Sequence, residues 1–346
     1  MNVRGETTME EYKFYQDKTI LVSGGAGSIG SAIVRKILEF EPKTVRALDI
    51  NETGLFELEQ SLKSQKLRLF IGDIRDRERL RRAIEGVDIV FHAAALKHVP
   101  LCEYNPFEAV KTNVIGTQNL IEVSMDEEVE KFITISTDKA VNPINVMGAT
   151  KLLAERLTIS ANFYKGKRKT AFSCVRFGNV LGSRGSVIPL FEEQIKANKQ
   201  ITITDPDMTR FVTSLSNAIE FILKIAELAC SGEIFILKMP ALKVKDLAEV
   251  IIEELAKKYE YNPRSIEIET IGRRAGEKLY EELITESEVE NAYENEKMYI
   301  VYPQGTTIND SQLKLLGNFE KVQEKCAPSN NIKLLTKEEI KALIQE

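Results

Sequence analysis

Three glycines near the start of the chain are spaced so that the backbone could bind a phosphate group. Gly24, Gly27 and Gly30 follow a short apolar run, Thr19–Ser23, and precede a segment, 31–40, whose apolar residues have helical spacing. Glycines at a strand-to-helix turn permit a tight turn and let the backbone approach a pyrophosphate at the helix N-terminus. A glycine triplet alone is a weak signal, but its place between strand and helix predicts a dinucleotide site.

A carboxylate at the end of the next predicted strand indicates which dinucleotide would bind. Asp49 comes 19 residues after Gly30, where it can accept hydrogen bonds from both ribose hydroxyls and repel a 2'-phosphate. The sequence therefore favours NAD over NADP, although Asp49 could instead cap the next helix. Asp73 ends the third predicted strand, where the adenine edge would lie, and an ordinary turn aspartate fits that spacing nearly as well.

A second group of reactive side chains follows the predicted strand 132–136. Thr137, Asp138 and Lys139 offer a hydroxyl, an acid and an amine in succession, and Met147 and Lys151 follow on a predicted helix. Residues four apart lie on the same face of a helix. Asp138 and Lys139 could be a surface charge pair in a loop, but a position directly after a strand of such a sheet favours acid–base chemistry.

The elements that would position these groups alternate between strand and helix. Such alternation predicts an α/β fold, a Rossmann-type doubly wound parallel sheet with right-handed crossovers. The predicted strands are 19–23, 44–50, 67–71, 87–93, 132–136 and 170–175, and the predicted helices are 31–40, 55–64, 77–84, 109–125 and 149–160.

The sequence after residue 176 is richer in loops, which predicts a second, smaller lobe. We expect a dinucleotide-binding domain at 1–176 and an interleaved C-terminal substrate lobe at 177–346. The segment 214–238 is expected to return to the first domain as a helix and a strand. Thr336 and Glu339 resemble a capping box, so a helix should end the chain.

Composition excludes several classes of protein. With 43% hydrophobic and 29% charged residues, the 346-residue chain should fold into one large domain or two lobes. A net charge of -5 argues against a general nucleic-acid binder. Four scattered cysteines, Cys102, Cys174, Cys230 and Cys326, suggest neither a metal site nor disulfides. Without a signal peptide or an apolar span of about 20 residues, we expect a soluble, cytoplasmic protein.

Longer strings of residues carry a family resemblance. The loop glycines, Ala93–Ala95, Thr137 and the pair at 147 and 151 resemble the extended short-chain dehydrogenase/reductase superfamily over most of the chain. More narrowly, STDKAVNP at 136–143, MGATK at 147–151 and ALKHVP at 95–100 resemble the UDP-N-acetylglucosamine 4,6-dehydratases of polysaccharide and glycan biosynthesis. The resemblance implies a hydro-lyase with tightly bound NAD that converts UDP-N-acetylglucosamine to a UDP-4-keto-6-deoxy-N-acetylhexosamine.

Met147 departs from the superfamily pattern. Most members carry a tyrosine four residues before the lysine, as the base that takes the substrate's hydroxyl proton, and a thioether has no ionisable proton. An inactive enzyme is one interpretation. Thr137, Asp138 and Lys139 supply alternative groups, however, and one subgroup of these dehydratases resembles this chain in carrying methionine here.

The resemblance also implies the order of the chemistry: hydride leaves sugar C4 for NAD, water is lost across C5 and C6, and hydride returns to C6. Lys139 is expected to remove the C5 proton, provided that burial or a cationic neighbour lowers its pKa. Asp138 would protonate the departing C6 hydroxyl, which requires a raised pKa. Thr137 would hydrogen-bond the C4 oxygen, and Lys151 would keep its role at the nicotinamide ribose.

The expected binding residues form two sets. For NAD they are Gly24, Gly27, Ser28, Ile29, Gly30, Asp49, Asn51, Asp73, Ile74, Ala93, Ala94, Lys97, Thr112, Ser136 and Lys151. For the UDP-sugar they are Lys97, Asn142, Asn179, Ser183, Arg184, Thr209, Arg210, Arg274 and Glu277. Guanidinium groups suit a diphosphate, and 273–278 resembles the family's uridine- and ribose-binding segment, although any one arginine could be a solvated surface residue.

Two rival functions are consistent with the same cofactor site. A UDP-sugar 4-epimerase also oxidises C4 but needs no base at C5, so Asp138 and Lys139 favour the dehydratase. A non-catalytic NAD-binding regulator is the other. No residue decides between retention and inversion at C5, and Met147 leans toward retention by resemblance alone. Because relatives commonly form dimers or larger rings, we also expect a homo-oligomer.

Overall fold

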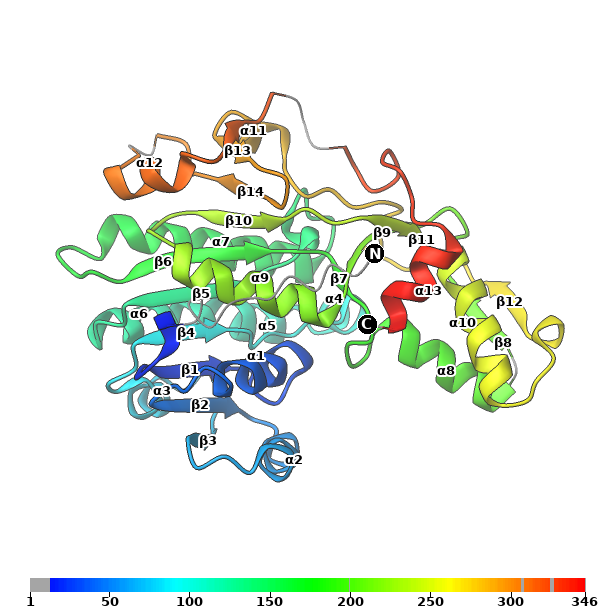
Figure 1. Cartoon of the computed structure of the whole chain (residues 1–346), viewed down its shortest axis with the longest axis horizontal. Helices are drawn as coiled ribbons and strands as arrows, with labels where there is room; N and C mark the ends of the chain where they lie inside the picture. The colour runs from blue at the N-terminus through cyan, green and yellow to red at the C-terminus, as the bar shows by residue number, and fades with distance from the viewer. Residues whose placement is uncertain (1–12, 199, 306–307, 324–326, 346) are drawn as a thin grey trace.

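A large sheet forms the centre of the protein. The computed structural model describes residues 13–198, 200–305, 308–323 and 327–345, and within them ten strands pair in the order β15-β13-β14-β10-β6-β5-β4-β1-β2-β3 (Figure 1). The strands are β1 (Thr19–Ser23), β2 (Thr44–Asp49), β3 (Leu67–Ile71), β4 (Ile89–His92), β5 (Lys131–Ile135), β6 (Ala171–Arg176), β10 (Ile234–Leu237), β13 (Ala292–Glu294), β14 (Met298–Val301) and β15 (Glu320–Lys321).

The strands from β3 to β10 pair in parallel, which confirms the predicted Rossmann-type sheet. Parallel strands covered on both faces read as continuous apolar runs, and every residue of β1 and β4 is buried. Because the carboxyl ends of these strands lie at one edge, the loops after β1, β4 and β5 meet there. That edge is where open α/β sheets bind ligands.

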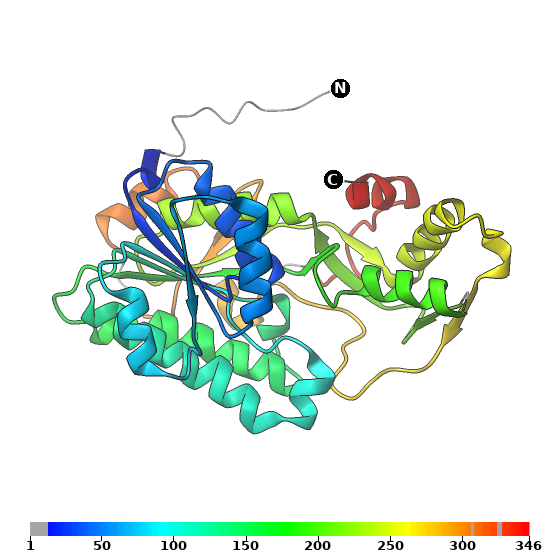
Figure 2. The same cartoon turned by 90° about the horizontal axis from the view of Figure 1, so that it is seen from below.

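Helices cover both faces of the sheet, as Figures 1 and 2 show. One face carries α1 (Ser28–Leu38) and α9 (Leu215–Leu228), and the other carries α3 (Arg77–Ile84), α6 (Gly116–Asp126) and α7 (Val146–Tyr164). The remaining helices of this part are α2 (Glu52–Leu62), α4 (Val99–Tyr104), α5 (Pro106–Val110), the π-helix η2 (Lys111–Ile115), the 3-10 helix η3 (Asp138–Ala140), α11 (Glu286–Val289) and α12 (Asp310–Leu316).

A smaller lobe lies beyond one end of the sheet (Figure 1). Its core includes Phe191, Ile195, Ile251 and Ile340, the last from the C-terminal helix, which docks as the capping box predicted. The lobe's elements are β7 (Asn179–Val180), α8 (Val187–Asn198), β8 (Gln200–Ile203), β9 (Thr209–Thr213), β11 (Ala241–Lys243), α10 (Val244–Lys258), η4 (Pro263–Ser265), β12 (Glu267–Thr270) and α13 (Lys337–Gln345).

Several elements differ from the sequence-based expectation. The helix expected at 109–125 is α5, η2 and α6 in succession, and α4 was not predicted. The segment 214–238 does return to the main sheet as α9 and β10, but β13, β14 and β15 join that sheet too, although 177–346 was otherwise assigned to the lobe. These three strands are two to four residues long and pair antiparallel, so their apolar pattern is too short to be recognised.

Candidate active site

The glycine loop between β1 and α1 has positions where there is no room for a side chain. Gly24 has φ +70°, and an added Cβ would lie 2.7 Å from the backbone nitrogen of Ala94. At Gly30, an added Cβ would lie 2.0 Å from the carbonyl oxygen of Gly24. No side chain caps the first turn of α1, so its N–H groups remain available to an anion. The loop therefore has the form that a dinucleotide pyrophosphate requires.

Asp49 ends β2 beside this loop. Its Oδ2 accepts a hydrogen bond from the N–H of Ala26 at 3.0 Å, and its Oδ1 accepts one from the N–H of Asn51 at 2.9 Å. These bonds orient the carboxylate, which lines the cleft where an adenosine ribose would lie. Asn51 itself has a different task, because its side chain caps α2 by accepting from the N–H of Gly54.

A cleft of about 890 Å³ runs from the glycine loop across the ends of β4, β5 and β6. Its volume lies within the usual range for cofactor and ligand sites. Every residue expected to bind NAD except Asn51 lines it: Gly24, Gly27, Ser28, Ile29, Gly30, Asp49, Asp73, Ile74, Ala93, Ala94, Lys97, Thr112, Ser136 and Lys151. The residues present therefore fit NAD.

The expected catalytic residues lie in and beside the same cleft. Thr137 Oγ1 donates a hydrogen bond to Asp138 Oδ1 at 2.9 Å, and Lys139 Nζ lies 2.9 Å from that same oxygen. Lys139 Nζ also donates to Asn179 Oδ1 at 3.1 Å. Asp138 is fully buried and its Oδ2 has no hydrogen-bond partner. Gly178 permits this arrangement, because a Cβ there would lie 3.1 Å from Asp138 Oδ2.

The surroundings of Lys139 correct one expectation. Burial alone would lower its pKa, but the carboxylates of Asp138 and Glu281 outweigh burial and Arg210, so the pKa is raised. The lowered pKa on which the expected role of Lys139 as a base depended is therefore contradicted. The physical reason is that two negative groups stabilise the ammonium form.

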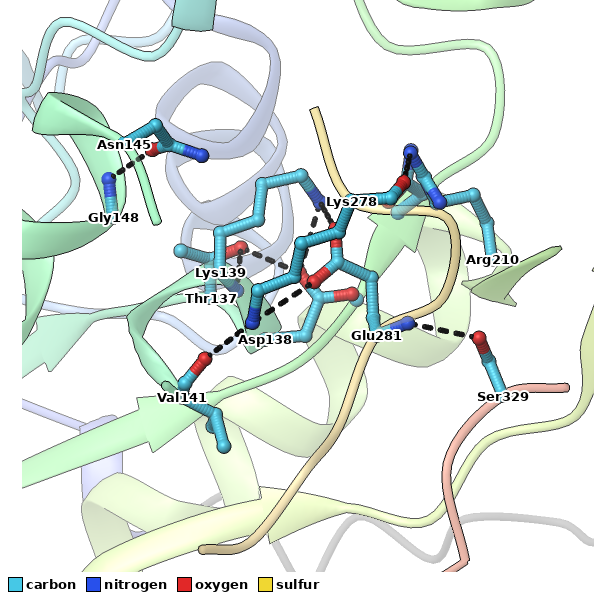
Figure 3. Close-up of polar contacts among 12 residues, drawn as sticks. Thr137, Asp138, Lys139, Val141, Asn145, Gly148, Arg210, Lys278, Glu281 and Ser329 are labelled. Carbon is cyan, nitrogen blue, oxygen red and sulfur yellow. Dashed lines mark hydrogen bonds and ion pairs between the residues drawn. The ribbon is translucent and has the colours of Figure 1, made fainter. Parts of the chain in front are cut away.

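Glu281 is the site residue that sequence reasoning missed. Its Oε1 forms an ion pair with Lys139 Nζ at 3.7 Å, and both side chains are drawn in Figure 3. Only 2% of the Glu281 side chain is exposed. Its backbone N–H donates to Ser329 Oγ at 3.0 Å, so a segment near the C-terminus fixes its position. In the sequence, Glu281 is marked only by a second glutamate beside it at position 282. Such glutamates in a loop are usually exposed to solvent.

Met147 and Lys151 both come from the first turns of α7 and both line the cleft. Met147 is buried among Cys102 and Ala109. Lys151 Nζ donates to the carbonyl oxygen of Ile135. Burial lowers the pKa of Lys151 to about 8.

The loop 181–186 crosses from the lobe to the glycine loop; we call it the cleft strap. The backbone N–H of Arg184 donates to Ser28 Oγ at 2.8 Å, and its guanidinium donates to the carbonyl oxygen of Ala26 at 3.2 Å. Lys97 Nζ donates to the carbonyl oxygen of Arg184 at 2.6 Å. Arg184, expected to hold the substrate diphosphate, thus contacts the cofactor loop here.

The other residues expected to bind substrate divide into two groups. Lys97, Asn179 and Ser183 line the cleft with Arg184, whereas Asn142, Thr209, Arg210, Arg274 and Glu277 do not. Asn142 donates to Glu282, and Arg210 donates to the carbonyl oxygens of Thr209 and Lys278, bracing the loop that carries Glu281. A direct contact between these five residues and a substrate stays a prediction.

Within the described residues, no cluster of three potential metal ligands occurs, and no helix is long and apolar enough to cross a bilayer. Cys102, Cys174 and Cys230 are free thiols, whereas Cys326 lies outside the described residues. The same holds for residues 1–12, which the expectation about a signal peptide concerns.

Comparison with known proteins places this site in a family. Residues 20–303 match the family described as "Polysaccharide biosynthesis protein". A Methanocaldococcus jannaschii protein, described as an uncharacterized membrane protein, is 67% identical, with 96% of this chain and 97% of that protein covered. A Campylobacter jejuni UDP-N-acetylglucosamine 4,6-dehydratase (inverting) is 43% identical, with 84% of each chain covered. A UDP-glucose 4-epimerase of Rickettsia rickettsii is 38% identical, covering 95% of this chain and 96% of its own.

A solved structure agrees with this placement. The protein Pen from Bacillus thuringiensis superposes with a TM-score of 0.88 at 45% sequence identity, covering 96% of this chain and 98% of Pen. The match extends over both the sheet and the lobe. From the family match, the relatives and the Rossmann-type cleft, the chain belongs to the polysaccharide biosynthesis family of extended short-chain dehydrogenase/reductases.

Proposed function

We propose that the protein is a nucleotide-sugar 4,6-dehydratase that removes water from UDP-N-acetylglucosamine and forms a UDP-4-keto-6-deoxy-N-acetylhexosamine. The observation that carries this proposal is the contact of Asp138 with Lys139, 2.9 Å apart beside the cofactor cleft. Loss of water across C5 and C6 needs a base for the C5 proton and an acid for the C6 hydroxyl. The pair supplies both groups.

NAD, when bound, supplies the hydride acceptor for C4 and the hydride donor for C6. The glycine loop would hold its pyrophosphate, Asp49 its adenosine ribose and Lys151 its nicotinamide ribose. The cleft strap closes over the glycine loop through Arg184 and Lys97. A cofactor held in this way should remain bound through many turnovers.

Each proton transfer has a candidate group. Thr137 Oγ1 would take the proton of the C4 hydroxyl while passing its own to Asp138, to which it already donates a hydrogen bond. Asp138 would then protonate the leaving C6 hydroxyl, and Lys139 would remove the C5 proton. Met147 would contribute packing only, so its lack of a proton does not interrupt the sequence.

A UDP-sugar 4-epimerase is the second candidate, because relatives named as epimerases cover nearly the whole chain. Incubation with UDP-N-acetylglucosamine separates the two. Loss of one water, detected by mass spectrometry, supports dehydration, whereas recovery of UDP-N-acetylgalactosamine at unchanged mass supports epimerisation. A non-catalytic regulator would not convert this or any other UDP-sugar, and Lys139→Ala would not change its behaviour. An NMR spectrum of the product gives the configuration at C5.

A further inference from the structure

The proposed dehydration needs Lys139 as an unprotonated amine, yet the structure favours its ammonium form. Lys139 Nζ lies 2.9 Å from Asp138 Oδ1 and 3.7 Å from Glu281 Oε1. An ammonium has no lone pair with which to take a proton from C5. A nearby group must therefore accept the ammonium proton before Lys139 can act.

Asp138 already transfers a different proton in the proposed reaction. Its Oδ1 accepts hydrogen bonds from both Thr137 and Lys139, and in the proposed reaction it carries the proton from the C4 hydroxyl to the C6 hydroxyl. If Asp138 took the proton of Lys139 as well, it could not accept the one from C4. The lysine proton therefore needs a different acceptor.

Glu281 has the environment of such an acceptor. Its carboxylate is almost fully buried, and Oε2 has no hydrogen-bond partner. Burial raises its pKa, and the charge of Asp138 adds to that rise, against the opposing charges of Lys139, Arg210 and Lys278. Lys278 Nζ lies 3.9 Å from Oε2 and donates its hydrogen bond to the carbonyl oxygen of Val141 instead (Figure 3).

We propose that Glu281 is a positioning residue that accepts the ammonium proton of Lys139 and returns it in each catalytic cycle. Once Lys139 Nζ and Glu281 Oε1, which lie 3.7 Å apart in the structure, approach to hydrogen-bond distance, an N–H bond of Lys139 breaks and an O–H bond of Glu281 forms. This leaves a neutral amine and a neutral carboxylic acid with no change in total charge. The amine then takes the C5 proton. When Lys139 gives that proton back to the sugar, Glu281 returns the stored one.

This inference rests on the proposed dehydration, and Glu281→Gln tests it. Glutamine keeps the size of the side chain but cannot hold the proton, so Lys139 must release it to solvent. We expect kcat at neutral pH to fall by about 10²-fold, with KM changed by less than about twofold. Because the transfer in the unchanged protein is internal, its kcat should vary little between about pH 6 and pH 8, whereas the kcat of the variant should rise with pH.

Two further variants separate proton transfer from structure. Glu267→Gln is the matched control, since this exposed carboxylate lies on β12 in the lobe and outside the cleft, and it should keep both kcat and the pH profile. Glu281→Asp, which still holds a proton, should restore the flat profile in part. A uniform loss of activity in Glu281→Gln with an unchanged pH profile would show a merely structural role and overturn the proposal, as would wild-type kinetics.

A second measurement keeps this proposal distinct from the proposed function. Lysine side-chain ¹⁵N NMR, assigned with Lys139→Arg, follows the titration of Lys139 without any substrate. In Glu281→Gln, the loss of the carboxylate should move the titration of Lys139 to lower pH. An unchanged titration would contradict the proposed interaction between Glu281 and Lys139. If the wild-type protein forms no dehydrated product, the proposed function fails, while the titration still reports on the pair.

Discussion

Lys139 and Lys151 both line the cleft, but their surroundings move their pKa values in opposite directions. Burial lowers the pKa of Lys151 to about 8, with Glu155 opposing that shift. The pKa of Lys139 is raised in spite of burial, because the carboxylates of Asp138 and Glu281 are close. Such opposed shifts within one site often mark groups with different chemical tasks.

The lowered pKa of Lys151 predicts that cofactor retention depends on pH. Below about pH 8 the side chain carries a charge that would strengthen the proposed hydrogen bonds to ribose hydroxyls, and above that pH the charge is lost. We expect the NAD retained after gel filtration to decline as the pH rises through about 8. Lys151→Met should retain less NAD at every pH and lose this dependence; equal retention by both proteins would contradict the assignment.

Asp49 should determine the choice between NAD and NADP. Both of its oxygens already accept backbone hydrogen bonds, which hold the carboxylate at the cleft. Asp49→Asn removes the negative charge, so we expect NAD affinity to fall by roughly tenfold or more, as for the loss of a charged hydrogen-bond partner. Calorimetry on protein freed of nucleotide should also show a smaller preference for NAD over NADP, and an unchanged preference would contradict this role.

Most candidate site residues could be predicted because they lie in local sequence motifs. Glu281, which comes from a distant part of the chain, could not. The glycine loop and the segment 136–139 each follow a strand directly, and Asp49 is the last residue of one, so the sheet itself brings them together. Glu281 lies far along the chain from Lys139 and reaches it through a loop held by Ser329. No periodicity or spacing in the sequence encodes that contact.

At the scale of elements, a buried ion pair fixes α7, the helix that carries Met147 and Lys151. Arg176 on β6 contacts Glu155 on α7 at 2.7 Å and Glu288 on α11 at 2.9 Å, and all three side chains are buried. The arginine thereby connects the sheet, the helix and the segment that follows Glu281. Removing one partner of such a group leaves an uncompensated buried charge.

Arg176→Met should therefore destabilise the protein strongly. We expect the free energy of unfolding to fall by about 3–5 kcal/mol, because two buried carboxylates lose their cation. Arg81→Met is the matched control, since its ion pair with Glu78 is largely exposed and should contribute less than about 1 kcal/mol. Urea denaturation measures both, and equal losses would show that the buried pair contributes no special stability.

The sequence pattern predicted the bounds of some elements but not of others. The strands β1 and β3 match their predicted ranges because apolar residues end abruptly at both sides. The sequence did not distinguish the π-helix η2 from an ordinary helix, because η2 continues α5 and contains no glycine or proline that would break a helical run. The π-helix places Thr112 at the cleft. Asn113, also in η2, forms two hydrogen bonds with the backbone of Leu96.

At the scale of the whole molecule, large exposed side chains suggest how copies of the chain could associate. Tyr104 on α4 and Phe107 on α5 are 87% and 80% exposed, and these two helices contact each other. Exposed apolar patches often mark protein interfaces. The expected homo-oligomer stays a prediction.

The double variant Tyr104→Glu and Phe107→Glu tests that prediction. Charges introduced at the centre of an apolar interface disfavour association, so we expect the sedimentation coefficient to shift to that of a monomer. Leu313→Glu, another exposed apolar position on the distant α12, is the control and should leave the assembly unchanged. An oligomer that survives the double variant must use another surface.

The cleft strap has a consequence for how the protein depends on its surroundings. If a dinucleotide binds beneath it, we expect the contacts of Arg184 with Ala26 and Ser28 to break before the dinucleotide leaves, so exchange with free nucleotide should be slower than turnover. In the proposed reaction the sugar returns the hydride that it gave up. The protein would then work at the same rate whatever the NAD/NADH ratio of the cell, because it draws on that pool when it acquires its cofactor and not in each catalytic cycle.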